Sequence, residues 1–566
     1  MGFTPSIPQT LRSLFHGNRF VIPDYQRKYS WGFEERKDLW DDVIENLELK
    51  HFIGTLCFMK DDEAGDIENE VYQIIDGQQR VTTLFILMNC LIEALDDETK
   101  RKPYTRMFIG NEETPKLIPL GEDADFINKL IFKFDTIFVD EISVRSQRHL
   151  YNAKIEFKNK IEGKSQEFIV QVIEYITNKI DVLIFDVEDH SQAVKMFTVI
   201  NDRGLQLNNL DKTKSSLMFY STLYLEEKLN DDINKKFGKI FDYLDNVIIK
   251  KDDLGILSTI DVTDFENTFY THHYYSSKML YDNWDYQLGA NSIYKRIKDG
   301  CESFKHDTEK LYQFIDNYIT DFESFAKSYS ELFNKIEQDV TYQQYFRYLQ
   351  FTATMFPLLI RLFEQEKLEP LFKILETVEV RIYKLKNTNP RSNIYRMASD
   401  VNQYKFSVDE IKGFLIGFTE TFLNDYLLEE YLAYGVDNKQ ALVKYILCEY
   451  NKTKNNQQLT IEKYSDLQIE HIFSRGLETG IKLYGFGRKE TYDLEISLLG
   501  NLTILESKVN VSARNAHPRD KEEHYNKSSV KINHLLAGSM NDFDREKMKE
   551  RNSNLIEFVK TRFSIE

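Results

Sequence analysis

The chain has 566 residues, of which 42% are hydrophobic and 13% aromatic, and a formal net charge of −18 at pH 7. This length exceeds what one hydrophobic core can organise, so we expect about three domains. The apolar content excludes a largely disordered protein. The acidic charge disfavours indiscriminate coating of DNA, because affinity for a polyanion comes from Lys and Arg contacts to phosphate. Any DNA-binding surface must therefore be local.

The cysteines are few and far apart and form no CxxC pair: Cys57, Cys90, Cys301 and Cys448. This spacing is typical of reduced thiols in the cytoplasm and disfavours a disulfide framework or a zinc finger. No apolar run approaches the ~20 residues that span a bilayer, and the N-terminus has no secretory core. We therefore expect a cytoplasmic protein with no membrane partner.

The first two hundred residues mix helices and strands, which predicts an α+β domain over 1–225. Short apolar runs at 51–58 and 71–76 are typical of buried strands, and residues 81–95 repeat apolar side chains with the helical period. A further strand is predicted at 181–188, followed by a helix at 191–200.

The string VYQIIDGQQRVTTLFIL predicts an anion site, because a buried strand ends at Asp76 and a helix begins near Gln79. Amide N–H groups at a helix start, with the positive end of the helix dipole, favour a bound anion. Arg80 adds a guanidinium that can bind phosphate through two hydrogen bonds, and Asp76 can hold a metal ion or a ribose hydroxyl. No GxxxxGK[ST] string occurs, which excludes a Walker-type NTPase.

Two other strings carry polar residues near this turn. Upstream, IPDYQRKYSW gathers Arg27 with Tyr29 and Trp31, a combination suited to stacking on a base and contacting phosphate. Downstream, FTVINDRGLQLNNLDKTKSS contains Asp211 and Lys214. Taken alone, DGQQR is better explained as a polar helix cap with a salt bridge, and YQRKYSW as an ordinary amphipathic loop.

From 226 to 450 the pattern is helical, rich in Tyr and Phe, and predicts a helical middle domain. The basic segment KLKNTNPRSNIYR at 384–396 is a candidate phosphate-contacting stretch, and a solvated helix end explains it equally well. The tract NKTKNNQQLT at 451–460 predicts a polar linker, and a compact mixed domain follows over 451–566.

The C-terminal segment predicts a strand that ends in Glu470 and His471, a second strand after Asn501, and a polar helix after Asn510. A hard cation such as Mg²⁺ or Mn²⁺ takes oxygen ligands, which Glu470 and Asn510 can supply. His471 can accept a proton from an attacking water, and Asn501 is placed to brace the loop that presents this imidazole. Neighbours on a regular strand point to opposite faces, so Glu470 and His471 converge only if the strand bends or ends there.

Each of these parts alone is commonly a surface carboxylate or a simple turn, but their combination in one segment is less often accidental. The order strand, strand, polar helix is that of a ββα-metal nuclease. The segment therefore predicts a metal-dependent nuclease.

Both ends of the chain resemble the GmrSD-type, modification-dependent (type IV) restriction endonucleases. IPDYQRKYSW, DGQQRVTTL and NDRG…DKTK are similar to the hallmark strings of that family's N-terminal domain, and IEHIF…LLGNLTIL…N…K…Y…S resembles its HNH-type C-terminal domain. The resemblance implies a ParB/sulfiredoxin-like domain that binds and hydrolyses nucleoside triphosphates, and a ββα-metal (HNH-like) nuclease domain.

The resemblance also implies roles for individual residues. The nucleotide site would comprise residues of the N-terminal strings: Arg27, Asp76, Gly77, Gln78, Gln79, Arg80, Arg203, Asp211 and Lys214. The implied catalytic residues are His471 and Asn501, and the implied metal ligands are Glu470 and Asn510. We further expect DNA contacts from Tyr29, Trp31 and Lys521. Two departures from the family pattern are SRG after EHIF, where Pro is usual, and Asn510 in place of His, which favours Mg²⁺ or Mn²⁺ over Zn²⁺.

The sequence thus predicts a predominantly helical α+β protein that acts as a DNA endonuclease of prokaryotic anti-phage defence. It would cut or nick modified or foreign DNA, regulated by a nucleoside triphosphate (NTP), and a homodimer is also compatible with the sequence. One alternative is a nucleotide-independent nuclease whose DGQQR region senses the modification directly. Another is a nucleotide-dependent sensor or scaffold with an inactive HNH module.

Overall fold

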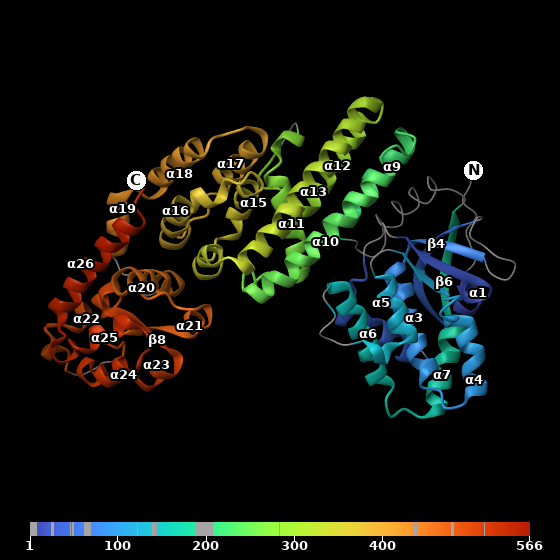
Figure 1. Cartoon of the computed structure of the whole chain (residues 1–566), viewed down its shortest axis with the longest axis horizontal. Helices are drawn as coiled ribbons and strands as arrows, with labels where there is room; N and C mark the ends of the chain where they lie inside the picture. The colour runs from blue at the N-terminus through green and yellow to red at the C-terminus, as the bar shows by residue number, and fades with distance from the viewer. Residues whose placement is uncertain are drawn as a thin grey trace. The chain divides into compact units, whose positions relative to one another are not determined.

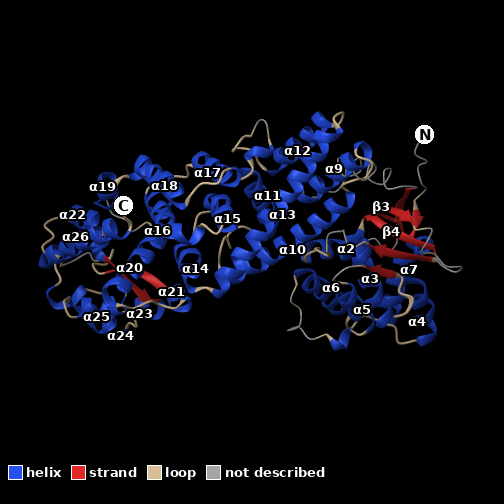
Figure 2. Cartoon of the chain, turned by 45° about the horizontal axis from the view of Figure 1, so that its top comes forward, coloured by secondary structure: helices blue, strands red, loops and turns tan. Residues whose placement is uncertain are grey.

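The computed structural model describes these residues: 8–23, 28–45, 47, 50–61, 70–120, 123–137, 142, 144–187, 208–281, 284–433, 436, 438–476, 480–513 and 516–565. Among these residues helices dominate, and strands occur only in the segments 9–187 and 467–506 (Figure 1, Figure 2). The α+β, predominantly helical class is confirmed. No helix in the described part of the chain is long and apolar enough to cross a lipid bilayer.

The chain divides into two compact units, each built from three stretches of sequence. The first unit comprises Met1–Ile249, Asp261–Thr271 and Gln287–Ser330, and the second comprises Lys250–Ile260, His272–Tyr286 and Glu331–Glu566.

A six-stranded mixed sheet in the order β1-β6-β3-β4-β2-β5 lies in the first unit. Its strands are β1 (Gln9–Thr10), β2 (Asn18–Ile22), β3 (His51–Lys60), β4 (Glu70–Asp76), β5 (Leu117–Pro119) and β6 (Ile180–Val187). β3 runs antiparallel to β4 but parallel to β6, and β4 runs parallel to β2. The three strands predicted in this region are therefore confirmed as β3, β4 and β6. The helix predicted at 191–200 lies outside the described residues.

Helix α3 (Gln78–Glu93) follows β4 directly and forms the centre of this part of the first unit. Every residue from Val81 to Ile92 is buried, because α6 (Arg145–Ile161) and α7 (Gln166–Asn178) also pack against it. A helix that is covered on all sides needs no polar face, which explains the long apolar run in its sequence.

The remaining helices of the first unit are α1 (Leu11–Phe15), α2 (Phe33–Glu45), α4 (Glu98–Tyr104), α5 (Ala124–Phe132), α9 (Asn209–Tyr224) and α12 (Ala290–Phe304). Three helices run through the points where the units exchange sequence: α10 (Asn230–Leu254), α11 (Val262–Tyr275) and α13 (Thr308–Gln338). The helical character predicted for the middle of the chain is confirmed.

The second unit continues with helices and ends in a small hairpin and its covering helices. The helices before the hairpin are α14 (Val340–Gln343), α15 (Phe356–Glu364), α16 (Leu368–Val378), α17 (Arg391–Gln403), α18 (Val408–Leu423), α19 (Asp425–Ala433), α20 (Gln440–Asn455) and α21 (Ile461–Asp466). The hairpin comprises β7 (Leu467–His471) and β8 (Leu502–Glu506), and the helices around it are α22 (Lys489–Glu495), α23 (Ser507–Ala513), α24 (Glu522–Lys527), α25 (Lys531–Ala537) and α26 (Arg545–Arg562).

The tract 451–460, predicted as a polar linker, is packed structure. Its first half forms the last turns of α20. Asn451 is fully buried, where its Nδ2 donates to the Gln457 carbonyl at 3.1 Å and its Oδ1 accepts from the Ile532 N–H at 3.1 Å. Asn451 therefore satisfies backbone groups, although several other polar residues of the tract are exposed.

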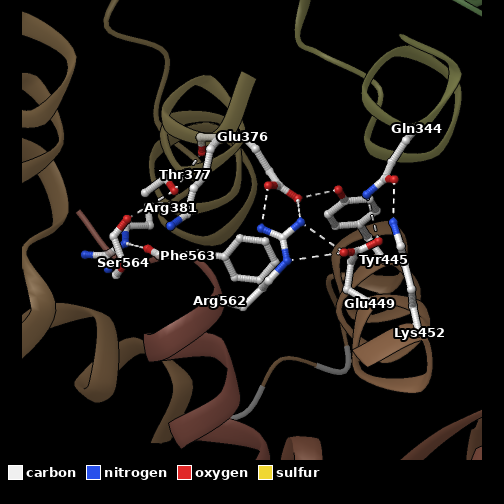
Figure 3. Close-up of polar contacts among 11 residues, drawn as sticks. Gln344, Glu376, Thr377, Arg381, Tyr445, Glu449, Lys452, Arg562, Phe563 and Ser564 are labelled. Atoms are coloured by element: carbon white, nitrogen blue, oxygen red, sulfur yellow. Dashed lines mark hydrogen bonds and ion pairs between the residues drawn. The ribbon is translucent and has the colours of Figure 1, made fainter. Parts of the chain in front are cut away.

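A buried charge network fixes the end of α26 to α16 and α20 (Figure 3). Arg562 donates to both carboxylate oxygens of Glu376, at 2.6 and 2.8 Å, and to Glu449 at 3.0 Å. The Tyr445 hydroxyl donates to Glu376 at 2.5 Å. Burial raises the pKa of Glu376, and the Arg562 guanidinium opposes that rise. Because breaking one member would leave a buried charge without its partner, this network holds the last helix firmly in place.

Candidate functional site

The C-terminal candidate site is built on the β7–β8 hairpin. The two strands pair antiparallel, with Glu470 opposite Thr503 and His471 opposite Leu502. Residues Leu502–Leu505 are all buried, because α20, α23 and α25 cover the hairpin. Helix α23, which contains Asn510, follows β8 at once and was not predicted, and the polar helix predicted after Asn510 corresponds to α24.

Glu470 lies in a buried ion pair with Lys521. The Lys521 Nζ donates to Glu470 Oε1 at 2.5 Å and to the His471 carbonyl at 2.7 Å. Glu470 is 6% exposed and Lys521 is 0% exposed. Burial raises the pKa of the Glu470 carboxyl, and the Lys521 ammonium opposes the rise. In this arrangement Lys521, which was predicted to contact DNA, has no exposed surface for it.

Asn510 lies on the same face of the hairpin as Glu470. Its Nδ2 donates to Gln468 Oε1 at 3.0 Å, and Gln468 and Glu470 are two residues apart on β7, so their side chains share a face. The bond uses the nitrogen end of the Asn510 carboxamide, which leaves Oδ1 as the end that can bind a cation. The structure thus brings Glu470 and Asn510 to one side of the hairpin.

β7 ends at His471, and the alternation of side chains ends with it. The next two residues, Ile472 and Phe473, are both fully buried in the same hydrophobic cluster. On a continuing strand they would point to opposite faces. The strand thus ends directly after His471, but Glu470 and His471 themselves are still paired within it, so their convergence on one cation stays a prediction.

Asn501 fixes the chain directly after His471. This fully buried side chain accepts a hydrogen bond from the Phe473 N–H at 2.7 Å and donates to the Phe473 carbonyl at 3.1 Å and the Ile496 carbonyl at 2.8 Å. These contacts are those of a residue that braces the loop. A direct catalytic role for Asn501 stays a prediction.

Two residues of α26, which the sequence did not single out, hold the turn that contains Asn501. Arg551 Nη1 donates to the Gly500 carbonyl at 2.7 Å and the Leu502 carbonyl at 2.8 Å, and Asn552 Oδ1 accepts from the Gly500 N–H at 2.9 Å. A Cβ at Gly500 would lie 2.3 Å from a backbone oxygen of α26, so only glycine allows this close approach. The glycine of GNL was the one signal in the sequence for this contact.

The donor set fits a hard divalent cation that keeps much of its water. Mg²⁺ is commonly bound through one or two carboxylates together with waters and substrate phosphates, and Glu470 and Asn510 supply one carboxylate and one amide oxygen. Within the described residues, no group of three or more His, Cys, Asp or Glu side chains is arranged to hold a metal ion. The protein would therefore supply few of the ligands of such a cation.

The N-terminal candidate site is the turn between β4 and α3. Gly77 has a φ of 92°, and a Cβ at this position would lie 2.3 Å from Leu56 Cδ2, so a glycine is required. Gln79 accepts from the Ser30 N–H at 2.8 Å and donates to the Lys28 carbonyl at 3.1 Å. This turn therefore holds the end of the IPDYQRKYSW string against the start of α3.

Asp76 and Arg80 form an oppositely charged pair at this turn. Burial raises the pKa of Asp76 while the Arg80 charge opposes the rise, and burial lowers the pKa of Arg80. Arg80 Nη1 donates to the Thr55 carbonyl on β3 at 2.9 Å, and a Cβ at Gly54 would come within 3.0 Å of the same nitrogen. Gln78 is buried at the first position of the helix. The pair and the helix start thus lie together, as the string predicts.

The other residues predicted for nucleotide or DNA lie as follows. Tyr29 is 6% exposed, its hydroxyl lies 2.8 Å from Thr83 Oγ1, and burial raises its pKa to about 12. Its ring is therefore part of the core and has no exposed face for a base. Trp31 is half-buried against the same core. Asp211 and Lys214 lie on α9, which packs against α12, and Arg27 and Arg203 lie outside the described residues.

The structure thus holds a mixed sheet with a polar strand–helix turn near its N-terminus and a C-terminal hairpin that carries Glu470 and His471. Residues 11–218 match the N-terminal domain of the GmrSD restriction endonucleases, and residues 420–558 match their C-terminal domain. The chain belongs to the GmrSD restriction endonuclease family. The Asp76–Arg80 turn lies in the first match, and the β7–β8 hairpin lies in the second.

The chain is also similar to an individual protein, an uncharacterized protein of Methanocaldococcus jannaschii. It is 21% identical over 258 residues, which is 40% of this chain and 43% of that protein. The chain therefore matches less than half of the length of this relative.

Proposed function

We propose that the chain is a DNA endonuclease of prokaryotic anti-phage defence, which cuts or nicks modified or foreign DNA at the β7–β8 hairpin with Mg²⁺ or Mn²⁺. The observation that carries the proposal is the placing of Glu470, His471 and Asn510 in one hairpin-and-helix unit. That unit lies in the segment that matches the C-terminal domain of a family of restriction endonucleases.

In this proposal each residue has a separate task. Glu470 and Asn510 hold the cation, which when bound stabilises charge on the scissile phosphate and the leaving oxygen. His471, as a neutral imidazole, accepts the proton of the attacking water. Asn501 keeps the chain after His471 in one position. Arg551 supports the turn that contains Asn501 by donating a hydrogen bond to the Gly500 carbonyl. A fixed imidazole maintains the orientation that water activation needs.

The distribution of charge supports placing the DNA at the C-terminal domain. Residues 451–566 contain 19 Lys and Arg and 17 Asp and Glu, a formal charge of +2, whereas the whole chain carries −18. The preceding 450 residues therefore carry −20. Because an acidic surface repels a polyanion, the segment from 451 onward is the part of the chain that DNA approaches most readily.

We further propose that the Asp76–Arg80 turn binds an NTP, whose hydrolysis regulates cutting. Helix α3 starts at Gln78 directly after Gly77, so its first amide N–H groups can bind a phosphate. Arg80 carries the positive charge beside them and Asp76 the negative one. Regulation requires that the nucleotide bind two arrangements of the protein with different affinity.

The central test is nicking of modified plasmid DNA in Mn²⁺ by wild type and by His471→Ala. Loss of the general base predicts a rate about 10²–10⁴-fold lower, with DNA binding retained. His306→Ala, which changes an exposed histidine of the first unit, is expected to cut normally. Equal cutting by His471→Ala and wild type would contradict the proposed nuclease site.

Two further outcomes separate the alternatives. A wild-type chain that hydrolyses NTP and binds modified DNA but never cuts would be a sensor or scaffold. Loss of phosphate release in Arg80→Ala, with cutting unchanged, would identify a nuclease that is independent of nucleotide hydrolysis.

A further inference from the structure

Lys521 is paired with Glu470, the carboxylate proposed to hold the metal ion. Its Nζ is 2.5 Å from Glu470 Oε1 and 2.7 Å from the carbonyl oxygen of His471. The lysine side chain is fully buried, and the glutamate side chain is 8% exposed. The carboxylate proposed to bind the cation is thus already neutralised by a cation of the protein itself.

The lysine can release this carboxylate without unfolding the strand. Lys521 ends a short 3₁₀ turn, Pro518–Lys521, and reaches β7 through a flexible four-carbon stem. β7 itself is held independently, by its pairing with β8 and by the bonds of Asn501 to Phe473. Movement of the Lys521 side chain therefore leaves the strand that carries Glu470 in place.

We propose that Lys521 competes with the catalytic cation for Glu470, so that the lysine must leave the carboxylate before the metal binds. A divalent cation and an ammonium on one carboxylate repel each other, and the repulsion is strong in a buried site of low dielectric. Glu470 with neither partner would be a buried charge with no cation beside it. Each cation therefore replaces the other.

A consequence is that DNA and metal bind cooperatively. The released ammonium needs a new anionic partner, and a phosphate of bound DNA supplies one. DNA therefore favours the arrangement in which Glu470 is open to the cation, and by reciprocity the cation favours DNA binding. The DNA contact predicted for Lys521 and its buried position then describe two states of one side chain.

The test is a titration of the full chain with Mn²⁺ alone, followed by electron paramagnetic resonance, with and without a short DNA duplex. All proteins carry His471→Ala, so that the duplex stays intact. In this background Lys521→Met is expected to bind Mn²⁺ about tenfold or more tightly without DNA and to lose most of the effect of DNA. Glu470→Gln is expected to lose Mn²⁺ binding. Mn²⁺ affinity that is unchanged or weaker in Lys521→Met would overturn the proposal.

Lys527→Met is the matched control. Lys527 lies on α24, six residues after Lys521, and pairs with Glu523 at 2.5 Å. In this pair the lysine and the glutamate side chains are both exposed. Its removal is expected to leave Mn²⁺ affinity unchanged. A gain equal to that of Lys521→Met would mean that general loss of positive charge causes the effect, which would also overturn the proposal.

A second measurement needs no change at Lys521 and so does not depend on whether that variant folds. Amine-reactive labelling of the otherwise wild-type chain, followed by peptide mass spectrometry, is expected to leave Lys521 protected without metal and labelled in saturating Mn²⁺, while Lys527 is labelled in both. Protection of Lys521 in saturating Mn²⁺ would contradict the competition. The inference rests on the proposed nuclease function, but both readouts measure metal and lysine directly, so failure of either is distinct from failure to cut DNA.

Discussion

The two candidate sites both place an acidic residue where a buried strand ends, and they differ in the origin of its counter-charge. In the N-terminal turn, Arg80 follows Asp76 by four residues, so one string contains both charges. In the C-terminal hairpin, Lys521 reaches Glu470 across 51 positions of sequence. A site with a local counter-charge can be found in the sequence, whereas a site with a distant one is assembled only by the fold.

The sites also differ in how their polar residues are used. At the N-terminal turn, Gln79 and Tyr29 mainly join the IPDYQRKYSW string to α3. At the hairpin, Asn501 and Arg551 join the site to backbone groups of its own domain. Substitutions can therefore separate residues that build each site from residues that face a ligand.

The largest expected effect is on the stability of the hairpin. Asn501→Ala leaves two carbonyls and one N–H of Phe473 and Ile496 buried without their partner. At about 1–3 kcal/mol for each group, we expect a loss of at least about 3 kcal/mol in chemical denaturation, together with loss of cutting. Asn541→Ala, which removes an exposed bond to Glu522, serves as the control and should change little. A stable Asn501→Ala protein would exclude the bracing role.

The next effect concerns the guanidinium of the N-terminal turn. Arg80→Ala removes the positive charge beside the start of α3, and hydrogen bonds to a charged group are worth about 1.5–3 kcal/mol. We therefore expect NTP affinity to fall about 10- to 100-fold in equilibrium binding measurements. Arg106→Ala, at an exposed position of the same domain, should bind as wild type. If both variants bind equally well, the nucleotide lies elsewhere.

A smaller effect concerns Asp76 at this turn, whose contribution to the free energy of unfolding depends on pH. Burial raises the pKa of Asp76 above its ordinary value of 3.8, so the stability that this group contributes is present below pH 3.8 and is lost as pH rises through the folded-state pKa. In Asp76→Asn this loss of stability is expected to disappear. The difference from wild type, measured by thermal unfolding over a pH series, is about 1.4 kcal/mol for each unit by which the folded-state pKa exceeds 3.8.

Asp97 serves as the control, because its contribution to stability changes with pH in the opposite direction to that of Asp76. Its pKa is lowered by hydrogen bonds from Thr99, so its contribution is present above pH 3.8 and is lost as pH falls through the folded-state pKa. Asp97→Asn should therefore change only the acidic end of the profile. An unchanged pH profile in Asp76→Asn would show that Asp76 is not the buried acid of the site.

The smallest effect tests the structural role of Tyr29. Tyr29→Phe removes the hydroxyl and with it the 2.8 Å contact with Thr83, and a single hydrogen bond contributes about 1 kcal/mol. We expect a loss of that size in denaturation and unchanged DNA binding in a filter or fluorescence assay. A large loss of DNA affinity would mean that the tyrosine leaves the core to contact DNA.

The local elements of both sites were predictable, because they depend on short-range patterns. Alternating or continuous apolar residues predicted β3, β4, β6 and β7, and the Asp76-Gly77 string predicted the strand–helix turn that the structure contains. The packing of residues distant in sequence was not predictable. Nothing near Lys521 indicates that its ammonium is buried on Glu470, and Arg551 looks like any arginine of an amphipathic helix.

Composition alone also gave a wrong expectation for the 451–460 tract. A run of Asn, Gln, Lys and Thr is typical of a solvated linker, but Asn451 is fully buried because its carboxamide pairs with backbone groups of Gln457 and Ile532. A polar side chain that bonds to backbone and one that bonds to water have the same letter in a sequence. Only the three-dimensional contacts distinguish them.

The Arg562 network limits how relatives of this protein can exchange parts during evolution. A crossover within 451–460 would pair an α26 from one parent with an α16 from another, and the buried Glu376 would depend on an arginine inherited separately. Such hybrids would survive only when both parents carry the same charges at these positions. The segment from about residue 331 onward is therefore expected to be inherited as a block, although the nuclease hairpin occupies only its last part.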